Sequence, residues 1–431
     1  MKFLETVKEQ SHILRLFSTY AFSNIISKLI PFVALPLILK DIGATEYGIW
    51  SLYLMILTVT APIMLAGVQH HINRNFSTEN KTQLASDLHN MALQMLGIMC
   101  IFYMVVLALN SQVKEFLSIP VQYFLIAPLV IVSMAIQRVQ VSLLMFHKRA
   151  VTMAVFDVGR TVSFYTITLV ILFMSSLQWQ ALFAGYCVSS ILFGGISAVL
   201  MIREGWFSGT LNWDTQRELI KTNTPLIANL MLSTLILTAD KVMLEMFLGT
   251  DAVGIYTLGF TIASFVLVIR NAVLKVWSPW AKSKLDSDID SDKIAFVRYA
   301  YLYVVFTSFV AFSISIAGYF YVLWAINDQA FYPATQVIPL IAFSNAIAVF
   351  AQIGEFSLNH AKKTFALPTI SIITLLLNLT LNFIMIPSYG IWGAALATCL
   401  TFIVRAYISI WFSQKYMPLP WIQALKISKG T

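Results

Sequence analysis

Charged residues are scarce in this chain. They make up 11% of its 431 residues, whereas a soluble globular domain carries about 25%. Hydrophobic residues make up 58%, and the mean hydropathy is +0.78. A soluble domain cannot remove that much apolar surface from water. The composition therefore excludes the soluble classes and predicts an all-α integral membrane protein.

Cysteine is also rare, and the sequence lacks the usual motifs of enzymes. Its three cysteines, Cys100, Cys187 and Cys399, lie inside apolar runs without metal-ligand spacing, so we interpret them as small hydrophobic residues. No glycine-rich phosphate loop and no histidine–carboxylate metal cluster occurs. Adjacent helical side chains point apart, so His70 and His71 are expected at a solvated rim. We expect neither an enzyme nor a resident cofactor.

Long apolar runs fill most of the chain. About twelve are long enough to cross a hydrocarbon core of about 30 Å. Their approximate limits are 13–39, 49–69, 90–109, 121–143, 151–174, 180–201, 223–247, 255–274, 299–324, 335–356, 365–387 and 391–412. No small-residue cleavage site follows the first run, so we expect it to stay as an anchor. The longest gap, 275–298, is expected to begin as an interfacial helix anchored by Trp277 and Trp280.

The basic residues are distributed unevenly between the two sides of the predicted membrane. With the N-terminus inside, nineteen of the 28 Lys and Arg residues lie in predicted cytoplasmic segments, and only Lys40 and Lys114 lie on the opposite side. Cytoplasmic loops are enriched in Lys and Arg. We therefore expect a protein of the bacterial inner membrane with both termini in the cytoplasm. The same bias accounts for most of the +8 net charge, which therefore indicates no nucleic acid partner.

One short phrase occurs twice, 206 residues apart. "IGATEYGIWSL" at 42–52 matches "LGTDAVGIYTL" at 248–258, which aligns Gly43 with Gly249 and Trp50 with Tyr256. Each is expected to be a short outer turn, with the glycine ending one helix and the aromatic residue starting the next at the interface. A weaker match joins 178–184 to 391–397. Coincidence between apolar segments is the alternative.

The repeat predicts the architecture. Six spans is an even number, so the halves 1–205 and 206–431 are expected to face the same way. They would form two parallel six-helix bundles around a central cavity, as in many transporters.

Two segments resemble a known superfamily of transporters. The segments are "TADKVMLEMF" with "LGTDAVGIYTLGF", and "NLTLNFIMIPSYGIWGAALATCLTFIV" at 377–403. The second carries Ile386-Pro387, then Tyr389-Gly390-Ile391, and the small-residue run 393–395. The chain thereby resembles, over essentially its whole length, the multidrug/oligosaccharidyl-lipid/polysaccharide (MOP) superfamily. It is most similar to the Wzx-type O-antigen flippases of the polysaccharide-exporter branch, since the two further spans of lipid II flippases are missing.

The resemblance implies a function in the assembly of surface polysaccharide. A flippase of this kind moves polyprenyl (undecaprenyl) pyrophosphate-linked oligosaccharide repeat units across the bacterial inner membrane by alternating access. Its partners would be this lipid-linked oligosaccharide, membrane lipids and other membrane proteins of polysaccharide assembly. A coupling ion, H⁺ or Na⁺, is left open. The alternatives are a multidrug or small-cation antiporter of the same superfamily and, third, a membrane enzyme of polysaccharide assembly.

Charged residues inside the predicted spans are the candidates for cargo binding, because each costs roughly 2.5–3.5 kcal/mol on insertion scales. Lys28 lies near the middle of span 13–39, and Asn24 lies one turn before it on the same face. Pro31 and Pro36 follow and are expected to act as a hinge for gating. The other cavity candidates are Arg138, Asp240, Lys241 and Arg270.

Each candidate has a structural alternative. Asp157 with Arg160, and Lys241 with Glu245, have the spacing of helical ion pairs. Arg138 can extend its side chain to the interface, and Lys28 can pair with Asp240 instead of cargo. Seven basic residues stand against four acidic ones within the spans, a difference of +3. This excess favours an anionic cargo such as a pyrophosphate, which Arg or Lys binds by charge-assisted hydrogen bonds.

Overall fold

The chain is helical almost throughout. The computed structural model describes residues 2–65, 67–68, 71–72, 76, 80–110, 115–116, 118–147, 149–287, 289–363 and 365–425. Within these ranges, the only strands form a ribbon of two short antiparallel strands, β1 (Glu115–Phe116) and β2 (Ile119–Pro120). The chain divides into two compact units, Met1–Thr234 and Leu235–Thr431. The predicted all-α class is confirmed, and a boundary of the repeat at residue 205 stays a prediction.

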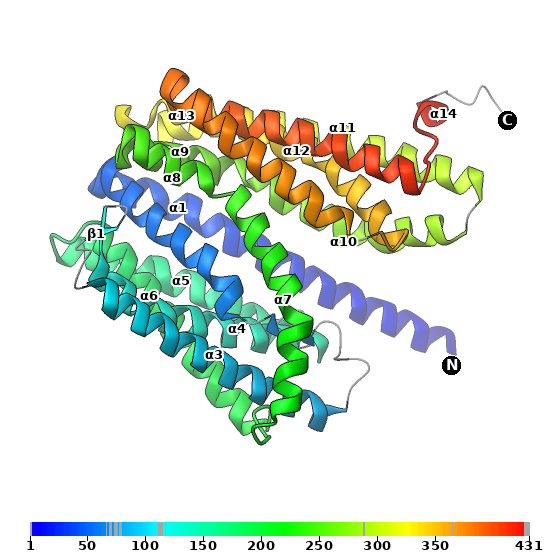
Figure 1. Ribbon diagram of the computed structural model, residues 1–431, viewed down its shortest axis with the longest axis horizontal. Coiled ribbons are helices and arrows are strands. Elements are labelled where there is room, and N and C mark those ends of the chain that lie inside the picture. The colour runs from blue at the N-terminus through cyan, green and yellow to red at the C-terminus, as the bar shows by residue number, and fades with distance from the viewer. Residues whose placement is uncertain are drawn as a thin grey trace. The chain divides into compact units, whose positions relative to one another are not determined.

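The first unit consists mainly of helices. It contains α1 (Lys2–Met64), α3 (Lys81–Asn110), η1 (Val121–Leu125), α4 (Ala127–Phe146), α5 (Ala150–Met174), α6 (Trp179–Arg203) and α7 (Trp213–Ile236) as far as Thr234. Helix α6 packs against both α4 and α5, and α5 also packs against α1 (Figure 1). A Cβ atom on Gly194 of α6 would lie only 2.6 Å from Ser133 of α4, so glycine allows this close packing.

The second unit is also helical. It contains α8 (Ala239–Leu248), α9 (Thr250–Ala263), α10 (Phe265–Asp286), α11 (Asp290–Phe320), η2 (Tyr321–Ile326), η3 (Gln329–Phe331), α12 (Ala334–His360), α13 (Ala366–Tyr416) and α14 (Trp421–Leu425). Helix α12 packs against α13, α11 and α9, and α8 packs against α13. A core around Trp277, Phe296 and Val349 fills one end of this unit.

The repeated phrase forms the same turn in both units. Gly43 has φ 74° and ψ −176°, and its counterpart Gly249 has φ 85° and ψ 177°. This backbone region is essentially restricted to glycine, so each glycine ends one helix and lets the next begin in a new direction. Gly390, with φ 62° and ψ −142°, bends α13 between the predicted spans 365–387 and 391–412.

Enough long apolar helices are present for a multi-pass membrane protein. Among the described residues, eight helices are long and apolar enough to cross a membrane, or nine if α7 and α8 form one bent span. Helices α1 and α13 each turn at a glycine and each hold two of the predicted spans. The helices therefore agree with the predicted layout of about twelve spans.

The aromatic residues of the repeat lie deeper than predicted. Trp50 and Tyr256 are 3% and 0% exposed, and Trp50 packs against Phe164 and Tyr186 within the first unit. Each stands seven residues after its glycine, which at about 1.5 Å per residue is roughly 10 Å along the helix. The prediction that they start the helix at the interface was wrong, because two turns of helix carry them into the interior.

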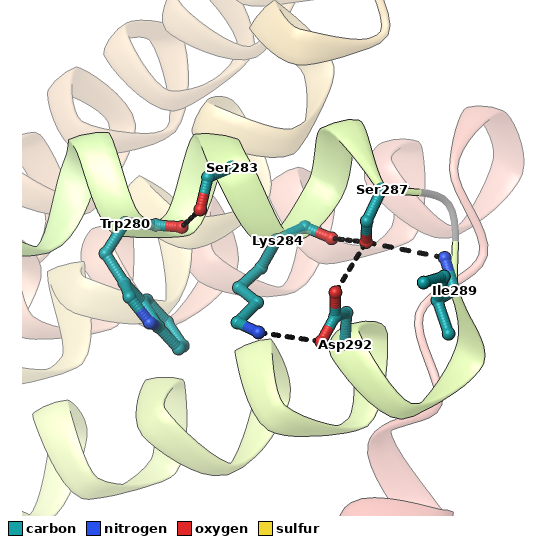
Figure 2. Close-up of polar contacts among 6 residues, drawn as sticks. All are labelled: Trp280, Ser283, Lys284, Ser287, Ile289 and Asp292. Atoms are coloured by element: carbon teal, nitrogen blue, oxygen red, sulfur yellow. Dashed lines mark hydrogen bonds and ion pairs between the residues drawn. The ribbon is translucent and has the colours of Figure 1, made fainter.

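The segment 275–298 also differs from its prediction. Helix α10 continues to Asp286, and Trp277 is buried against Phe296 and Phe356 instead of anchoring at an interface. Lys284 Nζ, near the end of α10, donates to Asp292 Oδ1 in the first turn of α11 over 2.8 Å (Figure 2). The charged residues of this segment therefore join α10 and α11, which form a helical hairpin.

Candidate cargo-binding site

A pocket of about 280 Å³ lies within the first unit and contains one charged residue, Arg138. Its walls come from the four helices α1, α4, α6 and α7 and from the turn after α1: Leu57, Thr58, Ala61, Pro62, Leu65, Gly67, Ile131, Met134, Arg138, Tyr186, Leu230 and Thr234. The lining is mostly apolar, with one guanidinium and the hydroxyl groups of Thr58, Tyr186 and Thr234. Such a pocket can hold a partly apolar anion in a fixed orientation.

The basic character of this region extends to a second arginine. Arg138 on α4 and Arg160 on α5 both interact electrostatically with Tyr186 on α6, and they repel each other. Tyr186 donates a hydrogen bond to Met134 Sδ over 3.1 Å, which fixes its hydroxyl at the pocket wall. Tyr186 was not among the predicted site residues. The sequence feature that could have indicated it is a tyrosine, with its polar hydroxyl, inside an apolar run.

Lys28 and its surroundings lie on α1 and α5 of the same unit. The Lys28 side chain is exposed on α1, and its neighbour Ser27 donates to Asp157 Oδ2 over 3.1 Å. Asp157 and Arg160, both described, form no ion pair with each other. Asp157 therefore accepts from Ser27 of α1 in place of the predicted pairing along α5.

The remaining predicted residues of α1 lie on one continuous helix. Asn24 falls within this helix, and its side chain lies outside the described side chains. Pro31 and Pro36 also lie inside it; of the described residues of α1, only Gly43 departs from helical backbone angles. Each proline lacks the N–H that would bond to the preceding turn, and their role as a hinge stays a prediction.

In the second unit, Asp240 is buried and accepts hydrogen bonds from its neighbours. It is 2% exposed, Tyr256 donates to its Oδ2, and the backbone N–H of Lys241 donates to its Oδ1 over 2.9 Å. The Lys241 ammonium lies 5.7 Å from the ring centre of Phe260. Tyr256 is the repeat counterpart of Trp50, so the hydroxyl that satisfies Asp240 belongs to this unit's version of the phrase.

Arg270 and Arg405 are also engaged by protein groups. Arg270 donates to the backbone oxygen of Asn345 over 3.1 Å. Arg405 donates from both Nε and Nη2 to Glu355 Oε1, each over 2.9 Å. Glu355 is thus the ion-pair partner of Arg405. Tyr303 accompanies the group and donates to the backbone oxygen of Arg270 over 2.8 Å.

The charge excess within the predicted spans belongs to the first unit. There, Arg15, Lys28, Arg138 and Arg160 stand against Asp157 alone, whereas three basic and three acidic residues balance in the second unit. In the described part of the chain, no carboxylate forms an ion pair with Lys28, Arg138 or Arg160. Unneutralised cations in a largely apolar unit are suited to bind an anion.

One buried histidine–carboxylate contact was not predicted. His71 Nε2 lies 2.9 Å from Asp87 Oδ2, with side-chain exposures of 4% and 8%, and Gln83 donates to the other oxygen of Asp87 over 3.0 Å. The solvated rim predicted for His71 was therefore wrong, because α3 begins at Lys81, before the predicted span, and brings Asp87 to it. His70 lies outside the described residues.

Comparisons with solved structures show the fold of a membrane transporter. An inward-facing multidrug resistance MATE family transporter of the MOP superfamily is 11% identical, with 95% of this chain and 96% of that chain covered and a TM-score of 0.66. The lipid II flippase MurJ in an inward closed conformation is 15% identical, with 93% and 87% covered and a TM-score of 0.63. A mutant of the Vibrio cholerae MATE transporter VcmN is 14% identical, with 94% and 97% covered and a TM-score of 0.62.

A comparison with protein families identifies the chain more directly. No curated protein matches it. The profile of the family described as "Polysaccharide biosynthesis protein" matches residues 13–283, which is more than half of the chain. With its long apolar helices and this match over more than half of its length, the chain belongs to the polysaccharide biosynthesis protein family.

Proposed function

We propose that this protein is a flippase for polyprenyl (undecaprenyl) pyrophosphate-linked oligosaccharide, acting in the assembly of O-antigen or a related surface polysaccharide. Membership in the polysaccharide biosynthesis protein family supports the substrate class. The observation that carries the proposal is the set of unpaired cations in the first unit, with Arg138 in an otherwise uncharged pocket. A pyrophosphate needs such donors, whereas a cationic drug would need a carboxylate.

Arg138, Lys28 and Asp240 each take a definite part in this proposal. Arg138 contacts the pyrophosphate, and Arg160 and Lys28 add positive charge that favours entry of the anion. Tyr186 holds the orientation of the bound group through its hydroxyl. Asp240, with its partner Tyr256, and Arg405, with its partner Glu355, stabilise the second unit and do not bind cargo.

The proposal is tested in cells that lack this gene. Loss of the protein should trap lipid-linked oligosaccharide on the cytoplasmic face of the inner membrane, and the wild-type gene should restore export. Arg138→Ala should fail to restore it, whereas Lys282→Ala, which removes an exposed lysine of α10, serves as the matched control. If deletion raises drug sensitivity without trapping the oligosaccharide, the antiporter alternative replaces the proposal. In a separate experiment, the coupling ion is the one, H⁺ or Na⁺, whose gradient must be present for transport in vesicles.

The orientation is part of the proposal. We place both termini in the cytoplasm of a cell with this protein in its inner membrane, because nineteen Lys and Arg residues lie on one predicted side and two on the other. Thr45, directly after the Gly43 turn, is exposed. In a variant without native cysteines, Thr45→Cys should react with an impermeant reagent on intact spheroplasts. Reaction only after lysis would reverse the orientation.

A further inference from the structure

A second pocket of the first unit lies where α4 and α6 end, and it is lined mainly by polar residues. Its volume is about 190 Å³. Six of its lining residues carry polar or aromatic groups: Lys81, Gln140, His147, Arg149, Glu204 and Trp206. It is smaller than the pocket of about 280 Å³ around Arg138. The space therefore suits a small group and not the oligosaccharide cargo.

Hydrogen bonds hold the two cations of this pocket around Glu204. Lys81 Nζ donates to the backbone oxygen of Glu204 over 2.9 Å and lies 5.0 Å from the ring centre of Trp206. Arg149 lies 3.3 Å from the Glu204 carboxylate, to which the Trp206 indole also donates over 3.0 Å. The Arg149 side chain is 60% exposed, so its pair with Glu204 is weak. Two cations against one carboxylate leave an excess of one positive charge for an anion.

Gln140 supplies the second feature. It is 1% exposed, and among the described residues its Oε1 has no hydrogen-bond partner. A buried acceptor without a donor destabilises the protein, so the pocket has a place for a ligand that donates a hydrogen bond. The site thus calls for an anionic group next to a hydroxyl.

The surroundings indicate where such a ligand comes from. Val151 and Val155 at the start of α5 are 71% and 60% exposed, and Ile202 at the end of α6 is 63% exposed. Helices α5 and α6 pack side by side (Figure 1). In the sequence, these apolar residues stand close to Arg149 and Glu204, which line the pocket. In a membrane-spanning helix, exposed apolar side chains face lipid, so acyl chains can lie beside a headgroup in the pocket.

We propose that this pocket binds the headgroup of an anionic phospholipid with a free hydroxyl, such as phosphatidylglycerol. The phosphate contacts Lys81 and Arg149, and the headgroup hydroxyl donates to Gln140 Oε1. The ends of α4 and α6 lie on the predicted cytoplasmic side, where basic residues meet anionic lipid headgroups. This lipid site is separate from the cargo pocket and does not rest on the flippase function.

The test measures lipid binding to the full-length protein in detergent, by native mass spectrometry and by thermal unfolding. Phosphatidylglycerol should bind more tightly than phosphatidylcholine and raise the unfolding temperature. It should also bind about fivefold more tightly than phosphatidylmethanol, which has the same charge and no headgroup hydroxyl, as expected for one hydrogen bond. Glycerol 3-phosphate, a soluble source of the same chemistry, should leave the unfolding temperature unchanged.

Two variants address the two contacts separately. Lys81→Ala with Arg149→Ala should remove the preference for phosphatidylglycerol over phosphatidylcholine, and Arg203→Ala, which removes an exposed charge outside the lining, should keep it. Gln140→Leu should remove only the discrimination against phosphatidylmethanol, which also gives a test if the double variant fails to fold. Equal binding of phosphatidylglycerol and phosphatidylcholine to the wild type, or an equal effect of glycerol 3-phosphate, would overturn the proposal.

Discussion

Replacing Arg138 by alanine should weaken cargo binding while leaving the fold intact. The described contacts of Arg138 include no hydrogen bond or ion pair, so the variant leaves no protein group without its partner. A hydrogen bond to a charged group contributes about 1.5–3 kcal/mol, and 1.4 kcal/mol corresponds to a factor of ten. Loss of one such contact with a pyrophosphate should therefore weaken binding roughly ten- to hundred-fold.

The assay uses the purified protein and a short-chain polyprenyl-pyrophosphate sugar. Arg138→Lys keeps the charge and loses the planar pair of donors, so it should bind with intermediate affinity. The thermal unfolding temperature of Arg138→Ala should stay close to that of the wild type. Wild-type affinity in a folded Arg138→Ala protein would refute the placement of cargo in this pocket.

Three further predictions concern the turn, the ion pair of the second unit and Lys28. Gly249→Ala should destabilise the protein by about 1–3 kcal/mol, since the backbone angles are essentially restricted to glycine and the space around it is open; an unchanged unfolding temperature would contradict this. Arg405→Ala should lower the unfolding temperature, and Glu355→Gln in addition should restore part of it, because no carboxylate is then left unpaired. Lys28→Ala should slow export by removing a charge that favours entry of the anion, and Asp240→Ala should not rescue it, because Asp240 is already satisfied within its own unit; rescue in an export assay would show that the two charges pair.

The features that the sequence predicts well are those that depend on a short segment of the chain. Apolar runs of about 20 residues mark spans wherever they occur. Gly43 and Gly249 stand at fixed places in a repeated phrase, and their shared backbone angles follow from glycine's freedom alone. The number of charged residues within each predicted span also follows from the sequence alone.

Pairings between distant helices could not be read in this way. Arg405 and Glu355 are 50 residues apart, and His71 finds Asp87 on the next helix. Helical spacing suggests partners on the same helix only, which is why Asp157 was matched with Arg160 and not with Ser27. The depth of Trp277 depended equally on which helices pack around it.

The direct test of the central claim is the location of lipid-linked oligosaccharide in cells without this protein. Right-side-out and inside-out membrane vesicles from the deletion strain are treated with an impermeant enzyme that cleaves the sugar. The account predicts that the oligosaccharide is cleaved in inside-out vesicles and protected in right-side-out vesicles, and that the wild-type gene reverses this while Arg138→Ala does not. Cleavage in right-side-out vesicles of the deletion strain, at the level of the wild type, would contradict a flippase.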